Sequence, residues 1–336
     1  MSKIRKLYYF DKKNVQEMIS FLNNNVTDNY INYLMFNPVL PLHYFLPLGL
    51  KFLPESYVLK DGNEIKSLIT VAPIGSKNKK MEIQKLFFDE NSVMEAAELV
   101  QYAVSKYKAM GAFSIIVKVD DYLPNLLSMF VTKCGFSQIS YEKLWRVTKF
   151  PEIEFNKKDF RIFRNSDAQA VAGLYNDILL PHFRPLLSKE VREFKEGIFK
   201  GLSYFNEYKY VLEDEKTKNI VACIVIQTYD NENFIVDIIQ NGWFEYDINE
   251  IIAYTVDRIK KRKKRFGLFI KSKKYTNLGE KFDKIFQKNK YECVQNQIVL
   301  TNSSARILKG ESEKVKYAML SNLCPANTIP TTKSSL

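Results

Sequence analysis

The two histidines of the chain are the first candidates for acid–base chemistry. His43 lies in LPLHYFLPL and His182 in LLPHFRPLL, so the two stand in similar settings of leucine and proline. An imidazole changes its charge near neutral pH and can take a proton from an amine. The alternative is a retained loop motif whose imidazole only satisfies nearby backbone groups. Both interpretations stay open at this point.

The four cysteines indicate neither a metal cage nor an activated nucleophile. They stand far apart without a CxxC pair, and two histidines beside them give no recognisable zinc pattern. A nucleophilic thiol needs a neighbouring base, and none can be recognised for Cys134, which ends an apolar helical stripe. We therefore predict no bound metal, a packing role for Cys134 and a reducing, cytoplasmic setting.

The net positive charge predicts an anionic partner or a basic face. The chain has 50 basic and 38 acidic side chains, a balance of +12. The densest run is KKRKKR at Lys260–Arg265. This run is typical of a solvated helix end, where cations complement the helix dipole. The alternative is contact with the phosphates of a nucleic acid or of a phosphorylated partner.

The longest apolar stretch does not predict a membrane span. Pro38–Pro54 (PVLPLHYFLPLGLKFLP) holds four prolines and a lysine and is shorter than the roughly 20 residues that a spanning helix needs. An interfacial membrane contact and a buried or substrate-facing loop remain as alternatives. We expect no secretory signal, because charged residues at positions 11–13 interrupt any early apolar run.

The elements that must position these residues alternate between strand and helix. The 336 residues predict two domains, and 46% hydrophobic residues suffice for packed cores. In the first half we expect a hairpin turning at Asp61-Gly62, a strand at Met81–Phe88 and a long helix capped by Asn91 or Ser92. A buried strand (AFSIIVKV), an amphipathic helix ending at Gly135 and a last strand follow.

The second half repeats this order. A short strand and a helix are followed by a hairpin (KYVLED, NIVACIVIQTY), a strand (NFIVDIIQ), a helix, the strand GLFIKSK, another helix and a final strand. We expect one domain over residues 1–150 and a second, degenerate one over 151–305. Residues 306–336 form a C-terminal extension.

One segment carries a resemblance to a known family. KYKAMGAFSIIVKVDDYLPNLLSMFVTKCGF resembles the strand, helix and Gly-Phe finish of the GCN5-related N-acetyltransferase (GNAT) superfamily. The resemblance implies an α/β fold with mixed α+β sheets and two tandem GNAT domains. We expect each half to have its own sheet, with strands that separate beside Phe87 in the first.

The family transfers an acyl group directly from acyl-coenzyme A, such as acetyl-CoA, to an amine. Backbone amides at a helix N-terminus hold the pyrophosphate, and a splayed strand holds the thioester arm. The residues of the first half that match this donor site are Leu86, Phe87, Phe88, Asn91, Ser92, Val93 and Met94. This turn lacks glycine and carries Asp89 and Glu90, which would repel a phosphate. The turn over 240–249 has one glycine and also carboxylates, so a capped structural helix is the alternative in both halves.

The resemblance also places the candidates for proton transfer. His43 and, more weakly, His182 would border the acceptor pocket, and Glu82 on the preceding strand is a rival base. The tyrosine that commonly protonates the leaving thiolate is replaced by Val131 in the first half and by Phe286 in the second.

These observations favour an N-acyltransferase whose first half is the catalytic unit. One alternative is a non-catalytic tandem module that binds partners through the proline-rich loops or the basic run. A transferase that uses an RNA-linked donor is another.

Overall fold

A computed structural model describes residues 3–303 except 9–10, 12, 16–53, 63, 76–78, 89, 154–159, 197–205, 215 and 243–246. His43, nearly all of the proline-rich stretch and the C-terminal extension lie outside the described residues.

Twelve strands form one mixed sheet in the order β1-β2-β3-β4-β5-β12-β6-β11-β10-β9-β8-β7. The strands of the first half are β1 (Lys3–Lys6), β2 (Glu55–Asp61), β3 (Glu64–Ile74), β4 (Lys80–Phe88), β5 (Ser114–Asp120) and β6 (Ser137–Arg146). Those of the second half are β7 (Phe160–Ile162), β8 (Asn206–Glu213), β9 (Ile220–Thr228), β10 (Asn233–Gln240), β11 (Gly267–Lys273) and β12 (Glu292–Ser303). The β4–β5 and β10–β11 pairs are parallel, and the remaining neighbours are antiparallel.

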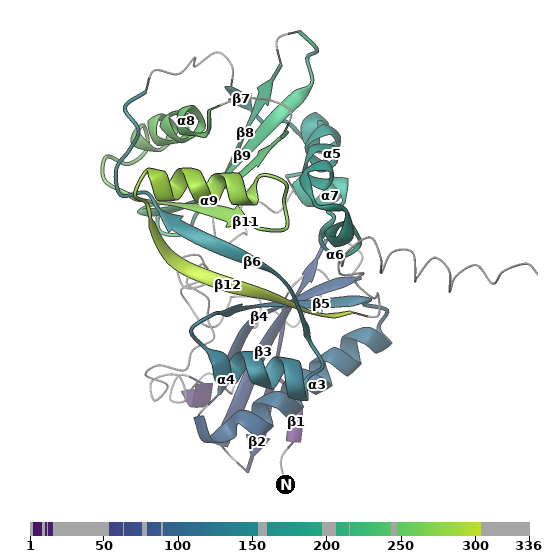
Figure 1. Cartoon of the computed structure of the whole chain (residues 1–336). Coiled ribbons are helices and arrows are strands. Elements are labelled where there is room, and N and C mark those ends of the chain that lie inside the picture. Colours follow the sequence, from purple (N-terminus) through teal and green to yellow (C-terminus); the bar gives the residue numbers. More distant parts are fainter. Residues whose placement is uncertain are drawn as a thin grey trace, which may run out of the picture. The chain divides into compact units, whose positions relative to one another are not determined.

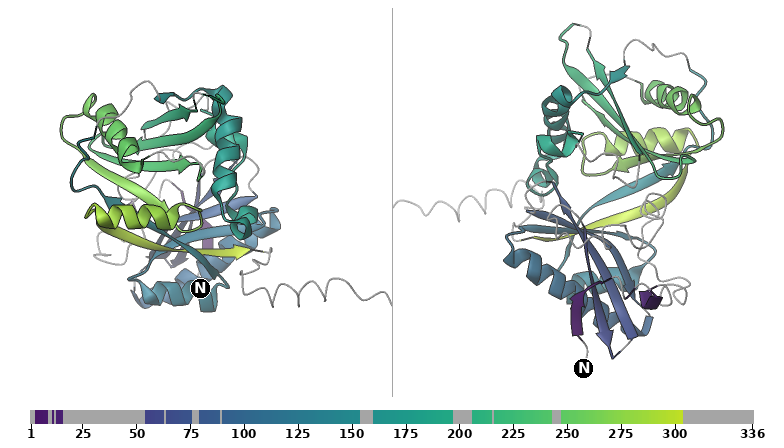
Figure 2. Two further views of the ribbon diagram at one scale, coloured as in Figure 1. Left: turned by 45° about the horizontal axis from the view of Figure 1, so that its top comes forward. Right: turned by 180° about the vertical axis from the view of Figure 1, so that it is seen from behind.

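Helices cover both faces of this sheet (Figures 1 and 2). Apolar side chains of α3 (Val93–Ala109) and α4 (Pro124–Ser128) pack on β2–β5, and those of α8 (Ile248–Lys260) and α9 (Gly279–Lys288) pack on β8–β11. The opposite face of the second half carries α5 (Ala168–Ile178), α6 (Arg184–Leu187) and α7 (Val191–Phe194). Ile116 and Val299 pack against this second layer, so α5 and its neighbours also reach strands β5 and β12. We call this side of the sheet the α5 face.

The predicted order is confirmed from the first hairpin onward, whereas β1, α6 and α7 were not predicted, and one predicted helix differs locally. The helix expected up to Cys134 begins as α4 and continues as a π-helical turn over Met129–Lys133. Gly135 follows with a φ of 67°, and Lys290 takes the matching place after α9 with a φ of 58°. A lysine thus adopts the left-handed conformation that glycine provides in the first half.

The expectation of a separate sheet in each half is wrong. Strand β12 of the second half lies between β5 and β6 of the first, and β6 in turn pairs with β11 of the second half (Figure 1). Each half therefore gives its last strand to the other. The exchange pairs strands that would otherwise be exposed sheet edges. Hydrophobic pattern reveals the strands but not which neighbour each one takes.

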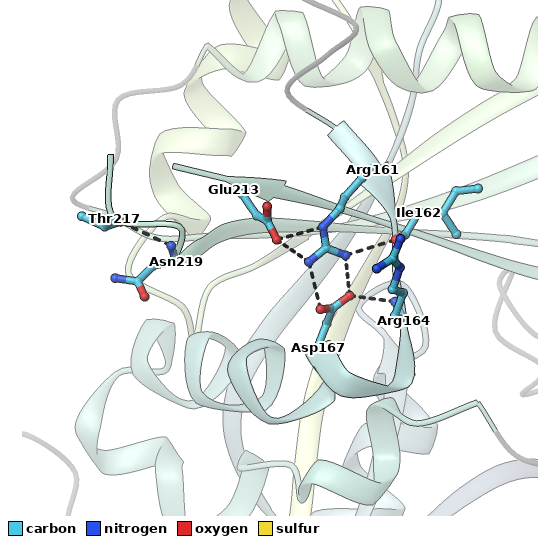
Figure 3. A network of polar contacts seen from close by, with 7 residues as sticks. All are labelled: Arg161, Ile162, Arg164, Asp167, Glu213, Thr217 and Asn219. Atoms are coloured by element: carbon cyan, nitrogen blue, oxygen red, sulfur yellow. Dashed lines mark hydrogen bonds and ion pairs between the residues drawn. The ribbon is translucent and has the colours of Figure 1, made fainter. Parts of the chain in front are cut away.

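One ion-pair motif marks the beginning of both halves. Arg161 donates to both carboxylate oxygens of Asp167 at 2.7 and 2.9 Å, and the backbone N–H three residues after the arginine donates to the same carboxylate (Figure 3). Arg5 and Asp11 repeat this arrangement at 2.7 and 2.5 Å, with the same backbone contact. The two residues are six positions apart in both cases, so the internal duplication extends to individual side chains.

Candidate functional site

The parallel strands of the first half separate where the resemblance places the donor. Strands β4 and β5 pair only from Lys80–Ile83 to Ser114–Val117, and both then continue without further pairing. A bulge between Ile83 and Lys85 on β4 lies at the point of separation. Side chains fill most of the space between the strands, because the cavity there measures about 10 Å³, enough for about one water molecule. An acyl-CoA arm would have to displace the Lys85 and Leu86 side chains that line it.

The predicted donor residues differ in burial, and Val93 is half-buried. Leu86, Phe87 and Phe88 are buried in the sheet, and Ser92 is buried at the start of α3. Asn91 and Met94 are exposed. Ser92 holds the N-cap position, but its side chain makes no capping hydrogen bond. The prediction of a side-chain cap on this helix is therefore wrong for Ser92, and the side chain leaves the first-turn amides to another acceptor.

The second half has the same separation, and a pair of charged side chains bridges its two strands. Pairing of β10 with β11 ends at Val236 and Ile270. Beyond that point the ammonium of Lys273 forms an ion pair with Asp237. At the following helix, the Asp247 carboxylate accepts a hydrogen bond of 2.9 Å from the backbone N–H of Asn249. The prediction of a side-chain cap is confirmed for α8.

A wide groove beside α3 is acidic. It has a volume of about 710 Å³ and is lined by Asp61, Met94, Glu95, Ala97, Glu98, Gln101 and Lys133. Three carboxylates against one ammonium repel a phosphate. The groove is therefore a poor site for the pyrophosphate of coenzyme A, although Met94 lines it.

A network of charges crosses the centre of the sheet on the α5 face. The Lys118 ammonium on β5 lies 3.0 Å from the Glu142 carboxylate on β6 and 3.8 Å from that of Glu82 on β4. The Tyr275 hydroxyl donates a hydrogen bond of 2.5 Å to Glu142. Burial alone would raise the pKa of Glu142, but the nearby ammonium of Lys118 and its other neighbours lower it to about 2. The Lys118 pKa is raised, because the two carboxylates outweigh the effect of burial.

Two further lysines on β11 share this face but differ in their partners. Burial would raise the pKa of Asp237, but Lys273 and Lys271 lower it to about 2. Lys273 also lies over the ring of Tyr175 on α5. The pKa of Lys271 is lowered to about 8, mainly by burial, which outweighs the attraction of Asp237.

The other predicted residues lie in more ordinary surroundings. His182 is exposed, and its ring lies 3.9 Å from that of the adjacent Phe183. Burial raises the pKa of the Cys134 thiol to about 11, which agrees with a packing role. Val131 is exposed and Phe286 is buried, so neither position supplies a proton.

The basic run lies at the end of α8 and is largely engaged within the chain. Lys261 pairs with Asp257 at 3.2 Å, and Lys263 pairs with Glu232 at 3.0 Å. Arg262 lies over the ring of Tyr208 and Lys260 over that of Phe150. These contacts are typical of a solvated helix end.

Lys118, Glu142 and Asp237 were not predicted from the sequence as site residues, and Lys271 and Tyr275 stood out only as neighbours of the basic run. A usable signal exists for the two lysines, because SIIVKVD and GLFIKSK each carry a lysine at the fifth position of a buried strand. A charge inside an apolar strand needs a partner or a function.

Within the described ranges, no group of three or more His, Cys, Asp or Glu side chains could hold a metal ion. No helix in this part of the chain is long and apolar enough to cross a bilayer.

Comparisons with known proteins support the fold. No family model and no curated protein matches the sequence. A tandem GNAT protein from the clavulanic acid biosynthesis pathway is similar in structure, with a TM-score of 0.57 and 7% identity over 91% of this chain and 99% of that one. A GCN5-related N-acetyltransferase from Sphaerobacter thermophilus has a TM-score of 0.59 and 9% identity over 90% and 95% of the two chains. A putative acetyltransferase from Pyrococcus horikoshii has a TM-score of 0.53 and 11% identity over 91% and 90%. The chain therefore has the fold of GCN5-related N-acetyltransferases, repeated in tandem within one mixed α/β sheet.

Proposed function

We propose that the protein is an acyl-CoA-dependent N-acyltransferase whose first half carries out the transfer. The observation that carries this proposal is the contrast between the two separations in the sheet. The first lies beside a helix without an N-cap side-chain bond, whereas the second lies beside a helix whose N-cap Asp247 already accepts a hydrogen bond from a first-turn amide. We further propose that the domains meet between β6 and β7, near residue 150, with residues 306–336 as an extension.

The donor is an acyl-CoA, with acetyl-CoA as the simplest case. Its pyrophosphate would accept hydrogen bonds from the first-turn amides of α3, near Asn91 and Ser92. The thioester arm would enter between β4 and β5 beside Leu86, after the side chains that fill the cavity move. Glu90 precedes this turn, so the site attracts phosphate less strongly than a glycine-rich turn would.

Glu82 is the proposed base for the acceptor amine. It lies two residues before the β4 bulge, and its carboxylate is held 3.8 Å from Lys118 on the α5 face. An ammonium must lose a proton before it can attack the thioester carbonyl, and a carboxylate at this point can accept it. The attacking nitrogen then forms the amide bond as the thiolate leaves. No described tyrosine occupies the usual position of the acid, and a thiolate can leave unaided because a thiol titrates near 8.5.

The donor half of the proposal is tested by isothermal titration with acetyl-CoA. We expect one site per chain. Asn91→Asp should weaken binding three- to tenfold, because it adds a negative charge where the pyrophosphate would bind. The matched change Asn249→Asp in the first turn of α8 should leave the affinity unchanged. Equal affinities for the wild type and Asn91→Asp would contradict this donor site.

The base is tested by the release of coenzyme A in the presence of a panel of amines. Glu82→Gln should lower turnover by about 10²–10⁴-fold without changing acetyl-CoA affinity. His43→Gln provides the comparison, because His43 remains the alternative base. A loss of turnover in His43→Gln alone would transfer the role to His43.

A non-catalytic tandem module is the second candidate, and the 10 Å³ cavity in the first half favours it. Absence of binding at 1 mM acetyl-CoA would select this candidate. A salt-dependent gel shift with transfer RNA would instead select an RNA-linked donor.

A further inference from the structure

The two halves place a lysine at the same point of the sheet. Lys118 follows Val117, the last residue of β5 that pairs with β4, and Lys271 follows Ile270, the last residue of β11 that pairs with β10. The two side chains are therefore equivalent within the duplicated fold. The strand register places the side chains of Lys118 and Lys271 on the α5 face of the sheet.

Lys118 has two carboxylate partners, and both are replaced at the corresponding positions around Lys271. Glu82 on β4 pairs with Ile116, the third residue of β5. Ile235 on β10 pairs in the same way with Phe269, the third residue of β11. Glu142 lies seven residues after Gly135, and Gln297 lies seven residues after Lys290. Around Lys271, Ile235 replaces the first glutamate and Gln297 the second, so neither negative charge is present.

The nearest acidic group does not compensate for this loss. Asp237 is engaged by Lys273. Among the described residues, the ammonium of Lys271 makes no hydrogen bond, ion pair within 4 Å or ring contact, although its backbone pairs with Leu144 on β6. A partly buried ammonium without a partner is unfavourable, so it is expected to meet an anion from outside the chain.

We propose that Lys271 binds the carboxylate of an elongated amine acceptor. The inference rests on the proposed function for the role of the amine. A carboxylate suits the site better than a phosphate, because Glu142 and Asp237 lie nearby and repel a second negative charge. The low pKa of Lys271, caused mainly by burial, agrees with an ammonium that lacks a partner.

The sheet also restricts the length of the acceptor. Glu82 on β4 and Lys271 on β11 are four strand spacings apart, which is about 19 Å between backbones. Both side chains lie on the α5 face, and the Glu82 carboxylate leans toward β5, 3.8 Å from the Lys118 ammonium, which shortens the distance that an acceptor must span. An α-amino acid carries its amine and carboxylate on one carbon and is too short to reach both. The geometry therefore points to an acceptor with a remote carboxylate, such as an ω-amino acid or a short peptide.

The test is trace labelling of lysines with acetic anhydride at pH 8, read by mass spectrometry of peptides from the whole protein. The exposed Lys284 on α9 serves as the internal reference. Lys271 should be labelled at least about tenfold faster than Lys118, since only neutral amines react. We expect 6-aminohexanoate or 8-aminooctanoate to slow Lys271 labelling at least fivefold relative to Lys284, and 6-aminohexanamide to leave it unchanged.

A thermal shift gives a second readout. The ω-amino acid should raise the melting temperature of the wild type and of Lys284→Gln but not that of Lys271→Gln. Labelling of Lys271 no faster than Lys118, no protection by either ω-amino acid, or equal protection by the amide would overturn the proposal. Neither readout uses acetyl-CoA, so failure of the donor site in its own titration leaves this test intact.

Discussion

The surroundings of Lys118 and Lys271 show how the two copies of one fold have diverged. Both lysines stand where parallel pairing ends, yet Lys118 is neutralised by Glu82 and Glu142 while Lys271 lacks both partners. In the first half, the charged side chains at this point form ion pairs with one another, and helix α3 begins without a side-chain cap. The second half caps its helix α8 and leaves the lysine available. The duplicated backbone therefore carries different arrangements of charge in its two halves.

The largest expected effect comes from removing the ammonium of Lys118. Lys118→Met leaves two carboxylates without their partner, and loss of one member of a buried pair costs about 3 kcal/mol. Chemical denaturation should show this loss, with Lys284→Met as a control that changes stability by less than about 0.5 kcal/mol. A Lys118→Met protein as stable as the wild type would show that the ion pairs of Lys118 with Glu82 and Glu142 do not stabilise the fold.

The Glu142 carboxylate should make the fold sensitive to acid. Its pKa is about 2 in the folded protein and about 4.3 when free. The folded state therefore gains stability from this group above pH 4.3 and loses it as the pH falls toward 2. We expect Glu142→Gln to be about 2 kcal/mol less stable at pH 7 and to show a shallower decline between pH 5 and 2. If the free energy of unfolding fell equally with pH in the wild type and in Glu142→Gln, the low pKa assigned to Glu142 would be contradicted.

Lys271→Met should have the opposite sign to Lys118→Met. The pKa of Lys271 lies below that of a free lysine, so the folded state disfavours its charge. This penalty is complete below pH 8 and disappears as the pH rises past about 10.4. Removing the charge should stabilise the protein by about 2–3 kcal/mol at pH 7, because the pKa falls from about 10.4 to about 8. Destabilisation by this variant would indicate that the ammonium has a partner within the chain.

The smallest expected difference in stability is between changes at the first residues of α8 and of α3. Asp247→Ala removes the capping bond of α8 and should cost about 1 kcal/mol. Ser92→Ala at the start of α3 should change stability by only a few tenths of that, because the Ser92 side chain makes no such bond. Urea denaturation of both variants measures the difference, and equal losses would contradict it.

Local patterns predicted most of the elements but not their assembly. Asp61-Gly62 marked the first hairpin, and the apolar strand GLFIKSK appeared as β11 with the same bounds. The position of β12 between β5 and β6 depends on long-range pairing, which alternation of side chains does not encode. Glu82 was identified through the resemblance alone, whereas its partner Lys118 was missed because contacts between strands distant in sequence are not visible in either segment. The placement of His43 stays a prediction.

Hydrogen exchange with and without acetyl-CoA tests the central claim that the first half binds the donor. We predict slower exchange in the first turn of α3 and in β4, with no change in the first turn of α8 or in β10. Protection of α8 and β10, or of neither half at saturating acetyl-CoA, would contradict the account.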